Sequence, residues 1–425
     1  MDNSLLTVRN INHKYIVSGG QVYMRLYRME LYKLCHKKSF TAGLIVVLLL
    51  GLFFFYNEAQ YGYCCINGTE YHGFEAIRMD RRITEEFRGA LTDKKIKQII
   101  EKYGFPQGKM DSYNRLPGNF LNTFIMEYAS DGYNNDRDDY KIATRTLPLA
   151  DTVLGQHYAS AGMEPTLEYY AGWAAFLSVF GVLMLGVSIL ILYSVSVIFA
   201  KEEETEMKPL LFTTKEGPAA DTLAKIAAAF SVSVGIWFLS VLFLLLLHIT
   251  VYGTDGLHCL AGLITMWSFA YETPLVLQPI GAYLAEVLLV SLLAVLELCA
   301  ITICVSAYCH NSFYAVVGAG ICYALPFLGY VTIQLGTALL MIYSAHSSVS
   351  SGFTTVCWYF FYFLRSAVYS SPVYLLVGRD SLIDLSRVRD VGEMKHVYFA
   401  LALAALLLVL CTVNAWHQYR KIRKA

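Results

Sequence analysis

FAKEEETEMKPLLFTTKEG, residues 199–217, separates two of the longest apolar runs in the chain. The first run ends at Phe199 and Ala200, most of the next six residues are charged, and the second run starts at Leu223. Each run exceeds the roughly 20 apolar residues that an α-helix needs to cross a bilayer. The stretch is therefore predicted to be a loop between two membrane-spanning helices.

The rest of the sequence agrees with a membrane protein. The chain has 425 residues, of which 56% are hydrophobic and 16% are charged, whereas soluble domains average about 25% charged residues. Whether the short stretch 257–271 and the aromatic stretch 353–377 cross the membrane is left open. Arg365 within the second stretch favours a re-entrant or interfacial helix there. Six other runs are long enough to span: 40–56, 171–200, 223–251, 280–308, 313–344 and 397–416.

Lysine and arginine are distributed asymmetrically around these runs. Residues 1–38 hold seven basic and two acidic residues, the segment after Trp416 holds four basic residues and no acid, and residues 252–279 hold neither Lys nor Arg. Because cytoplasmic loops are enriched in Lys and Arg, both termini are predicted to be cytoplasmic. The chain is then a multi-pass protein of the cell membrane with an even number of spans.

These observations predict an all-α polytopic membrane protein with six transmembrane helices. A basic segment before the first span has an amphipathic pattern, with Met24, Tyr27, Leu31 and Leu34 on one side and Arg25 and Arg28 on another, as in an interfacial helix. The alternative is a basic flank that only orients the first span. The predicted segments are residues 1–38 with the amphipathic elbow helix, span 39–56, external insert 57–168, span 169–200, cytoplasmic loop 201–222, spans 223–344, external loop 345–396, and span and basic tail 397–425.

The large external insert is predicted to be partly folded. Ile83 and Phe87 are spaced to share one helix face, and Thr92 or Asp93 is suited to cap a second helix. We expect a helical pair there, followed by a looser stretch that is rich in Tyr, Asn and Asp and ends near residue 145. The apolar face of the second helix would hold Ile96, Ile99, Ile100 and Tyr103.

The loop itself is predicted to contain a short helix. Pro209 suits a first helical turn, and Gly217–Pro218 suits a stop followed by a new helix. The face formed by Leu210, Leu211 and Thr214 is too small to be buried within the loop, so it is suited to dock into a groove of a partner protein.

In these residues the loop resembles that of the ABC type 2 exporter permeases, which are bacterial membrane-spanning transporter subunits. The family pattern is matched by Phe199 and Glu202, by Met207 with Leu210 and Leu211, by Thr213 with Thr214, by Gly217 and by Ala224-Lys225-Ile226. Glu206 stands where the family often has Gly before the Met, and Pro218 stands where a basic residue is common. The alternative is an ordinary charged loop with a short helix in it.

The resemblance implies an exporter that works with separate ABC ATPase subunits and with a second permease subunit, identical or different. The loop would be the coupling helix that receives the motion of the ATPase. ATP and Mg²⁺ would be held by that partner, and this chain would contain no cofactor. The residues implied in ATPase coupling are Glu202, Met207, Leu210, Leu211, Thr213, Thr214, Gly217 and Lys225.

Motifs for other chemistry are missing from the sequence. It contains no G-x-x-x-x-G-K-[ST] phosphate-binding loop, no H-E-x-x-H and no G-x-S-x-G, so no catalytic residue, metal ligand or enzymatic activity is predicted. A formal net charge of zero gives no reason to expect nucleic acid. Cys64 and Cys65 are expected as free thiols, with a disulfide to Cys259 or Cys357 as the alternative. A membrane enzyme, or a non-transporting anchor or sensor, remains an alternative function.

Two carboxylates within the fourth span are candidates for a cargo path. Glu286 and Glu297 are eleven residues apart, which places them about 20° from a common helix face. A carboxylate near the middle of a bilayer is costly unless it is neutral or paired. The pair either forms a polar stripe that faces cargo, or Glu297 hydrogen bonds to a neighbouring helix while Glu286 lies at the headgroups.

Overall fold

The apolar runs of the sequence form long helices. A computed structural model of the chain describes residues 23–108, 116–134, 140–213, 217–264, 276–346, 351–377 and 396–421. Within these ranges, six helical segments are long and apolar enough to cross a membrane, which confirms the predicted six-span, multi-pass architecture. They are α2 (Lys38–Gln60), α7 (Ala171–Val195) with α8 (Val197–Glu204), α10 (Gly217–Tyr252), α11 (Ile280–Tyr308), the first part of α12 (Ser312–His346) and α16 (His396–Tyr419).

The helices around the charged loop are longer than predicted. The second span was expected to end at Ala200, but α8 continues to Glu204, because Lys and Glu are good helix formers and prolong the helix beyond the apolar run. The chain then turns into the short α9 (Lys208–Phe212), which has proline in its first turn as predicted. The apolar part of the third span was expected from Leu223, and α10 begins at Gly217, where Gly217–Pro218 was predicted to start a new helix.

The structure divides into two compact units. The first unit contains Met1–Leu49, Leu183–Ser240 and Leu289–Ala425, and the second contains Leu50–Val182 and Val241–Leu288. Each unit is described separately below.

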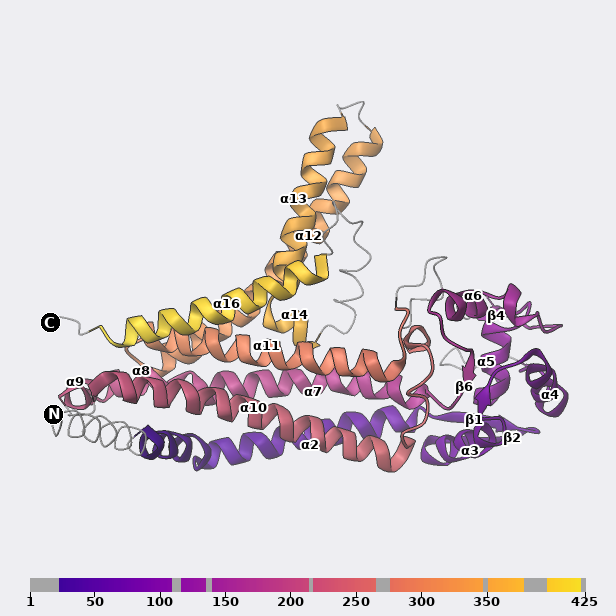
Figure 1. Cartoon of the computed structure of the whole chain (residues 1–425), viewed down its shortest axis with the longest axis horizontal. Helices are drawn as coiled ribbons and strands as arrows, with labels where there is room; N and C mark the ends of the chain where they lie inside the picture. Colours follow the sequence, from indigo (N-terminus) through magenta and orange to yellow (C-terminus); the bar gives the residue numbers. More distant parts are fainter. Residues whose placement is uncertain are drawn as a thin grey trace, which may run out of the picture. The chain divides into compact units, whose positions relative to one another are not determined.

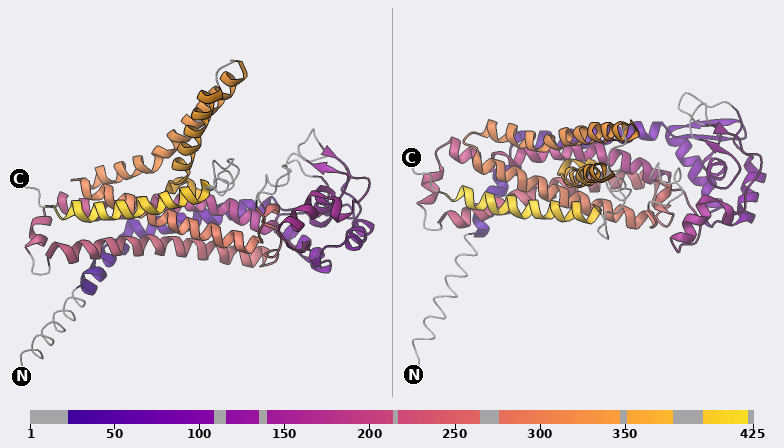
Figure 2. Two further views of the ribbon diagram at one scale, coloured as in Figure 1. Left: turned by 45° about the horizontal axis from the view of Figure 1, so that its top comes forward. Right: turned by 90° about the horizontal axis from the view of Figure 1, so that it is seen from above.

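In the first unit, the aromatic stretch 353–377 is helical and forms α13 (Ser351–Tyr369) and α14 (Pro372–Val377). The α13 helix returns beside the second half of α12 (Figures 1 and 2). A side chain at Gly329 would lie 2.8 Å from Val368, so glycine is what allows this close approach. The two helices therefore form an antiparallel hairpin, closed by a buried cluster of Ile333, Val368, Tyr369 and Ala400.

The second unit holds the insert, whose secondary structure is mixed. The hairpin of β1 (Tyr63–Ile66) and β2 (Thr69–His72) turns at Asn67 and Gly68, with φ values of 51° and 79°, as a tight two-residue hairpin requires. A second antiparallel pair joins Gly89–Ala90 to Thr166–Leu167 at the end of the insert. The remaining elements are α3 (Gly73–Glu86), β3 (Gly89–Ala90), α4 (Asp93–Tyr103), α5 (Phe120–Tyr128), β4 (Tyr133–Asn134), β5 (Tyr140–Lys141), η1 (Leu149–Asp151), α6 (Val153–Ser160), β6 (Thr166–Leu167) and η2 (Ala261–Leu263), with β3 paired to β6 and β4 to β5.

The predicted helical pair of the insert is present, with two differences. Thr92 caps α4 as expected, since its side chain accepts a hydrogen bond from the backbone N–H of Lys95. Phe87, however, lies just beyond α3 and contacts Tyr103, because the chain leaves the helix there. The stretch expected to be loose contains α5, which starts at a capping box of Asn119 and Asn122. Polar residues there cap a helix rather than prevent one.

Candidate functional site

The predicted coupling residues divide around one buried cation, Lys225. The side chain of Lys225 has no exposed area, and its Nζ lies 2.5 Å from Asp221, 3.1 Å from Glu202 and 3.6 Å from Glu30. These carboxylates come from α10, from α8 and from the helix of residues 23–35. An ammonium group has three N–H donors, so its capacity matches the three surrounding carboxylates.

Tyr419 and Phe199 connect this group to two further helices. The hydroxyl of Tyr419 hydrogen bonds to Glu202, and its ring stacks on Phe199 at 4.3 Å between centroids. The Oγ of Ser306 in α11 accepts hydrogen bonds from the backbone N–H groups of Phe199 and Ala200, at 3.1 and 3.2 Å. We call Glu30, Glu202, Asp221, Lys225 and Tyr419 the Lys225 network; it joins the helix of residues 23–35 to α8, α10 and α16.

The short helix α9 is attached to this network at one end. Lys208 pairs with Glu203, and its Nζ lies 4.8 Å from the centre of the Tyr419 ring. Lys208 is buried. Lys208 of α9 therefore directly contacts a side chain of the Lys225 network.

Apolar side chains at the other side of α9 are exposed. Leu210 is 62% exposed and Met207 47% exposed, large values for apolar side chains. Leu211 is partly buried and Thr213 is exposed. Such a small apolar surface beside charged residues is suited to contact a partner protein.

The structure thus separates residues that the loop pattern had placed in one group. Lys225 is buried and Glu202 is partly buried in the Lys225 network, where they connect helices. Gly217 starts α10, and Thr214 lies outside the described residues. Met207 and Leu210 are the exposed apolar members of the predicted set.

The turn between α8 and α9 passes through a left-handed backbone position. Glu206 has φ of 54°, in the left-handed region that glycine adopts without steric cost. The turn between α8 and α9 therefore favours glycine at this position. Glu206 adopts this backbone conformation although it has a side chain.

The two carboxylates of α11 do not share an environment. Glu286 is exposed and accepts a hydrogen bond from Gln278 at 2.8 Å. Glu297 is fully buried, and neither of its carboxylate oxygens has a hydrogen-bond partner among the described residues. The two positions therefore differ in burial although their helix faces nearly coincide, and the polar stripe stays a prediction. The alternative, a hydrogen bond from Glu297 to a neighbouring helix, is not formed among the described residues.

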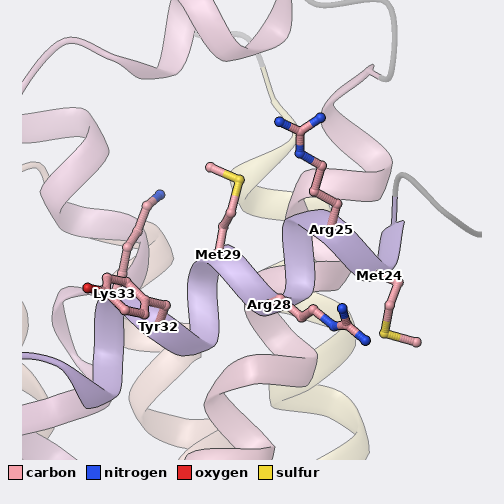
Figure 3. Close-up of a pocket in the computed structure, with 6 residues that line it drawn as sticks. All are labelled: Met24, Arg25, Arg28, Met29, Tyr32 and Lys33. Carbon is pink, nitrogen blue, oxygen red and sulfur yellow. The ribbon is translucent and has the colours of Figure 1, made fainter.

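The helix of residues 23–35 has a buried and an exposed side. Glu30 and Leu34 are buried, and the hydroxyl of Tyr27 donates a hydrogen bond to Ser231. Met24, which was predicted to share a helix side with Tyr27 and Leu34, is 47% exposed. The exposed side borders a shallow pocket of about 520 Å³, and Figure 3 shows the side chains that line it: Met24, Arg25, Arg28, Met29, Tyr32 and Lys33.

Sequence reasoning missed three members of the Lys225 network. Asp221 precedes Lys225 by four residues, and this i,i+4 spacing on a helix could have revealed it. Glu30 is the one acid among the basic residues of the helix 23–35, which was a weaker signal. Tyr419 is 217 residues from Glu202, and no local pattern connects them.

Comparisons of the chain with known proteins found no matching family model, no matching curated protein and no matching solved structure.

Proposed function

We infer that this chain is the membrane-spanning permease subunit of an ABC exporter, driven by ATP hydrolysis in separate ATPase subunits. The observation that carries the proposal is the arrangement of α9, which has exposed Met207 and Leu210 on one side and a direct connection to the Lys225 network on the other. The resemblance of the loop to the ABC type 2 exporter permeases supports the same conclusion. Both termini and α9 would be cytoplasmic.

The Lys225 network supplies a means of transmitting force. A push on α9 reaches Tyr419 and Glu203 through Lys208. From there, short contacts between charged groups connect α8, α10, α16 and the helix of residues 23–35. Breaking a buried ion pair leaves an uncompensated charge at a cost of several kcal/mol, so these elements would move together when the ATPase moves.

The helix of residues 23–35 fits the role of an amphipathic elbow on the cytoplasmic leaflet. Its exposed side combines two methionines and a tyrosine with three basic side chains (Figure 3). Apolar groups that enter the acyl boundary, beside cations that meet anionic headgroups, are what an interfacial helix needs. Lipid is thus a third partner, besides the ATPase and a second permease subunit.

The docking of α9 can be tested by co-purification with candidate ABC ATPase subunits. Replacing Met207 and Leu210 with Asp should abolish association, because each buried apolar anchor contributes about 1.5–3 kcal/mol and the loss of two weakens binding by well over tenfold. Association and ATP hydrolysis would be measured on the detergent-solubilised complex. As a control, Thr205→Asp adds an acid to the same loop on an exposed residue outside α9.

The outcomes of this experiment separate the proposed functions. Loss of association in the Met207/Leu210 variant, with retention in Thr205→Asp and an unchanged helical content in both, supports the permease. Unchanged association in the double variant contradicts docking through α9. A wild-type chain that associates with no ATPase would favour the anchor, sensor or enzyme alternatives.

A further inference from the structure

A basic pocket lies in the second unit, beside the end of α10. It has a volume of about 470 Å³ and is lined on one side by successive turns of α3 and on the other by Thr250, Val251 and Asp255. Residues three or four apart share a helix face, so the α3 residues form one continuous stripe: Phe74, Arg78, Arg81, Arg82 and Glu85.

Arg81 lines the pocket and connects its two sides. Its Nη1 donates a hydrogen bond of 3.1 Å to the carbonyl of Val251, and its Nη2 lies 3.6 Å from Asp255. Gly253 has φ of 77°, and a side chain there would collide with the Arg81 guanidinium. Arg81 thus attaches α3 to the chain leaving α10, and its own charge is compensated.

The nearby carboxylates are paired with another arginine, Arg88. Arg88 lies 3.1 Å from Asp255, 3.5 Å from Glu85 and 3.5 Å from Glu168. Within the described part of the chain, neither Arg78 nor Arg82 is paired with an acid or hydrogen bonded to another residue, and both are exposed. Two uncompensated guanidinium groups therefore remain one turn apart at the pocket.

The position of the pocket indicates what kind of anion it meets. Thr250 and Val251 belong to the last turn of α10, a candidate membrane span that ends at Tyr252. Tyr56, near the end of α2, is 54% exposed, and its ring lies 5.9 Å from that of Phe74, which is itself 36% exposed. Exposed aromatic residues at the ends of spans are typical of the headgroup level of a bilayer.

We propose that Arg78 and Arg82 bind the phosphate of an anionic membrane phospholipid, whose acyl chains continue along the apolar surface near Tyr56 and Phe74. Arginine binds phosphate oxygens through paired N–H groups. A soluble phosphate would make the same polar contacts but would leave the exposed aromatic rings without a partner. The proposal requires only that α2 and α10 span the membrane, and it is independent of the transport function.

Native mass spectrometry of the full chain in detergent can test this proposal. Dioleoyl-phosphatidylglycerol is titrated against the wild type and against the Arg78→Gln/Arg82→Gln variant, and dioleoyl-phosphatidylcholine is titrated in parallel. The control is Lys94→Gln/Lys97→Gln, which removes two exposed positive charges from α4 in the same unit. Circular dichroism and size-exclusion chromatography confirm that each variant is folded.

We expect the arginine variant to bind phosphatidylglycerol about tenfold more weakly, because it loses two charge-assisted contacts. The lysine variant and the wild type should bind it equally, and phosphatidylcholine should bind more weakly to the wild type. Equal binding by the arginine variant, or an equal loss in the lysine variant, would overturn the proposal. Displacement of the lipid by millimolar glycerol phosphate would assign the site to a soluble phosphate ester instead.

Discussion

Lys225 shows how one residue can hold several helices together. It is fully buried, and three carboxylates surround it. Replacing Lys225 with Met keeps the length of the side chain but removes the cation from Asp221 and Glu202. Glu30, in contrast, still pairs with Lys33 at 2.6 Å. We expect a loss of about 3–5 kcal/mol in stability, measured as a lower thermal unfolding temperature in detergent.

A nearby lysine provides the control. Lys201 is 59% exposed and pairs with Glu204 three residues along α8, and such surface pairs contribute about 0–1 kcal/mol. Lys201→Met should therefore unfold near the wild-type temperature. If both variants unfolded at the same temperature, Lys225 would not be the centre of a stabilising network.

Glu206 allows a second prediction at the residue scale. Its left-handed backbone, with φ of 54°, costs a residue with a side chain about 1–2 kcal/mol. Glycine would avoid this cost but would lose about 0.5–1 kcal/mol through its greater freedom in the unfolded chain. Glu206→Gly should thus be neutral or stabilising by up to about 1.5 kcal/mol, whereas Glu206→Val should be destabilising. Thermal unfolding of the two variants in parallel checks this order.

At the scale of elements, Asp131 holds a loop of the insert against the β4–β5 hairpin. Its carboxylate accepts hydrogen bonds from the backbone N–H of Thr144 at 2.8 Å and of Arg145 at 3.0 Å, from the Thr144 hydroxyl, and from Lys141. These bonds favour the charged form. The backbone hydrogen bonds of Thr144 and Arg145 are the main reason why the pKa of Asp131 lies well below its ordinary value.

This shift predicts how stability depends on pH. Because the pKa of Asp131 is lower in the folded chain than in the unfolded chain, its stabilising effect is complete above the ordinary pKa of about 3.9 and is lost as the pH falls toward the folded-state pKa. Asp131→Asn should be less stable than the wild type at pH 6, and this difference should narrow toward pH 3. The measurement is thermal unfolding of the full chain in detergent.

The matched control is Asp151→Asn, which changes an exposed aspartate elsewhere in the insert. The unfolding temperature of this variant is measured over the same pH range. A gap between Asp131→Asn and the wild type that does not change with pH would contradict the assignment of Asp131 as an anchored carboxylate.

At the scale of the whole molecule, six spans and basic termini predict one topology. Residues 57–168 should be external, and α9 should be cytoplasmic with both ends of the chain. With the native cysteines removed, Lys97→Cys in α4 should react with a membrane-impermeant maleimide on intact cells. Thr213→Cys should react only after the membrane is permeabilised. Both positions are exposed, so the reverse pattern would mean that the orientation is wrong.

The sequence by itself determined the class of the protein and the places where helices form. A helix satisfies its backbone hydrogen bonds internally, and a bilayer demands a long apolar run, so the six spans could be read from local composition. The α9 helix and the Thr92 cap of α4 were predictable for the same reason, since proline, glycine and a capping threonine act within one turn. Helix ends were less predictable because charged residues that favour helix, such as Glu202 to Glu204, extend a helix beyond its apolar part.

Only the tertiary structure decided which side chains act together. The Lys225 network gathers residues from four helices, and Tyr419 meets Glu202 across 217 residues of sequence. Glu286 and Glu297 nearly share a helix face, yet one is exposed and the other is buried, because burial depends on neighbouring helices that periodicity does not reveal. Arg78 and Arg82 are left without a carboxylate because the fold directs Asp255, Glu168 and Glu85 to Arg88. Charge pairing over long sequence distances is set by packing, and packing is not encoded in any local pattern.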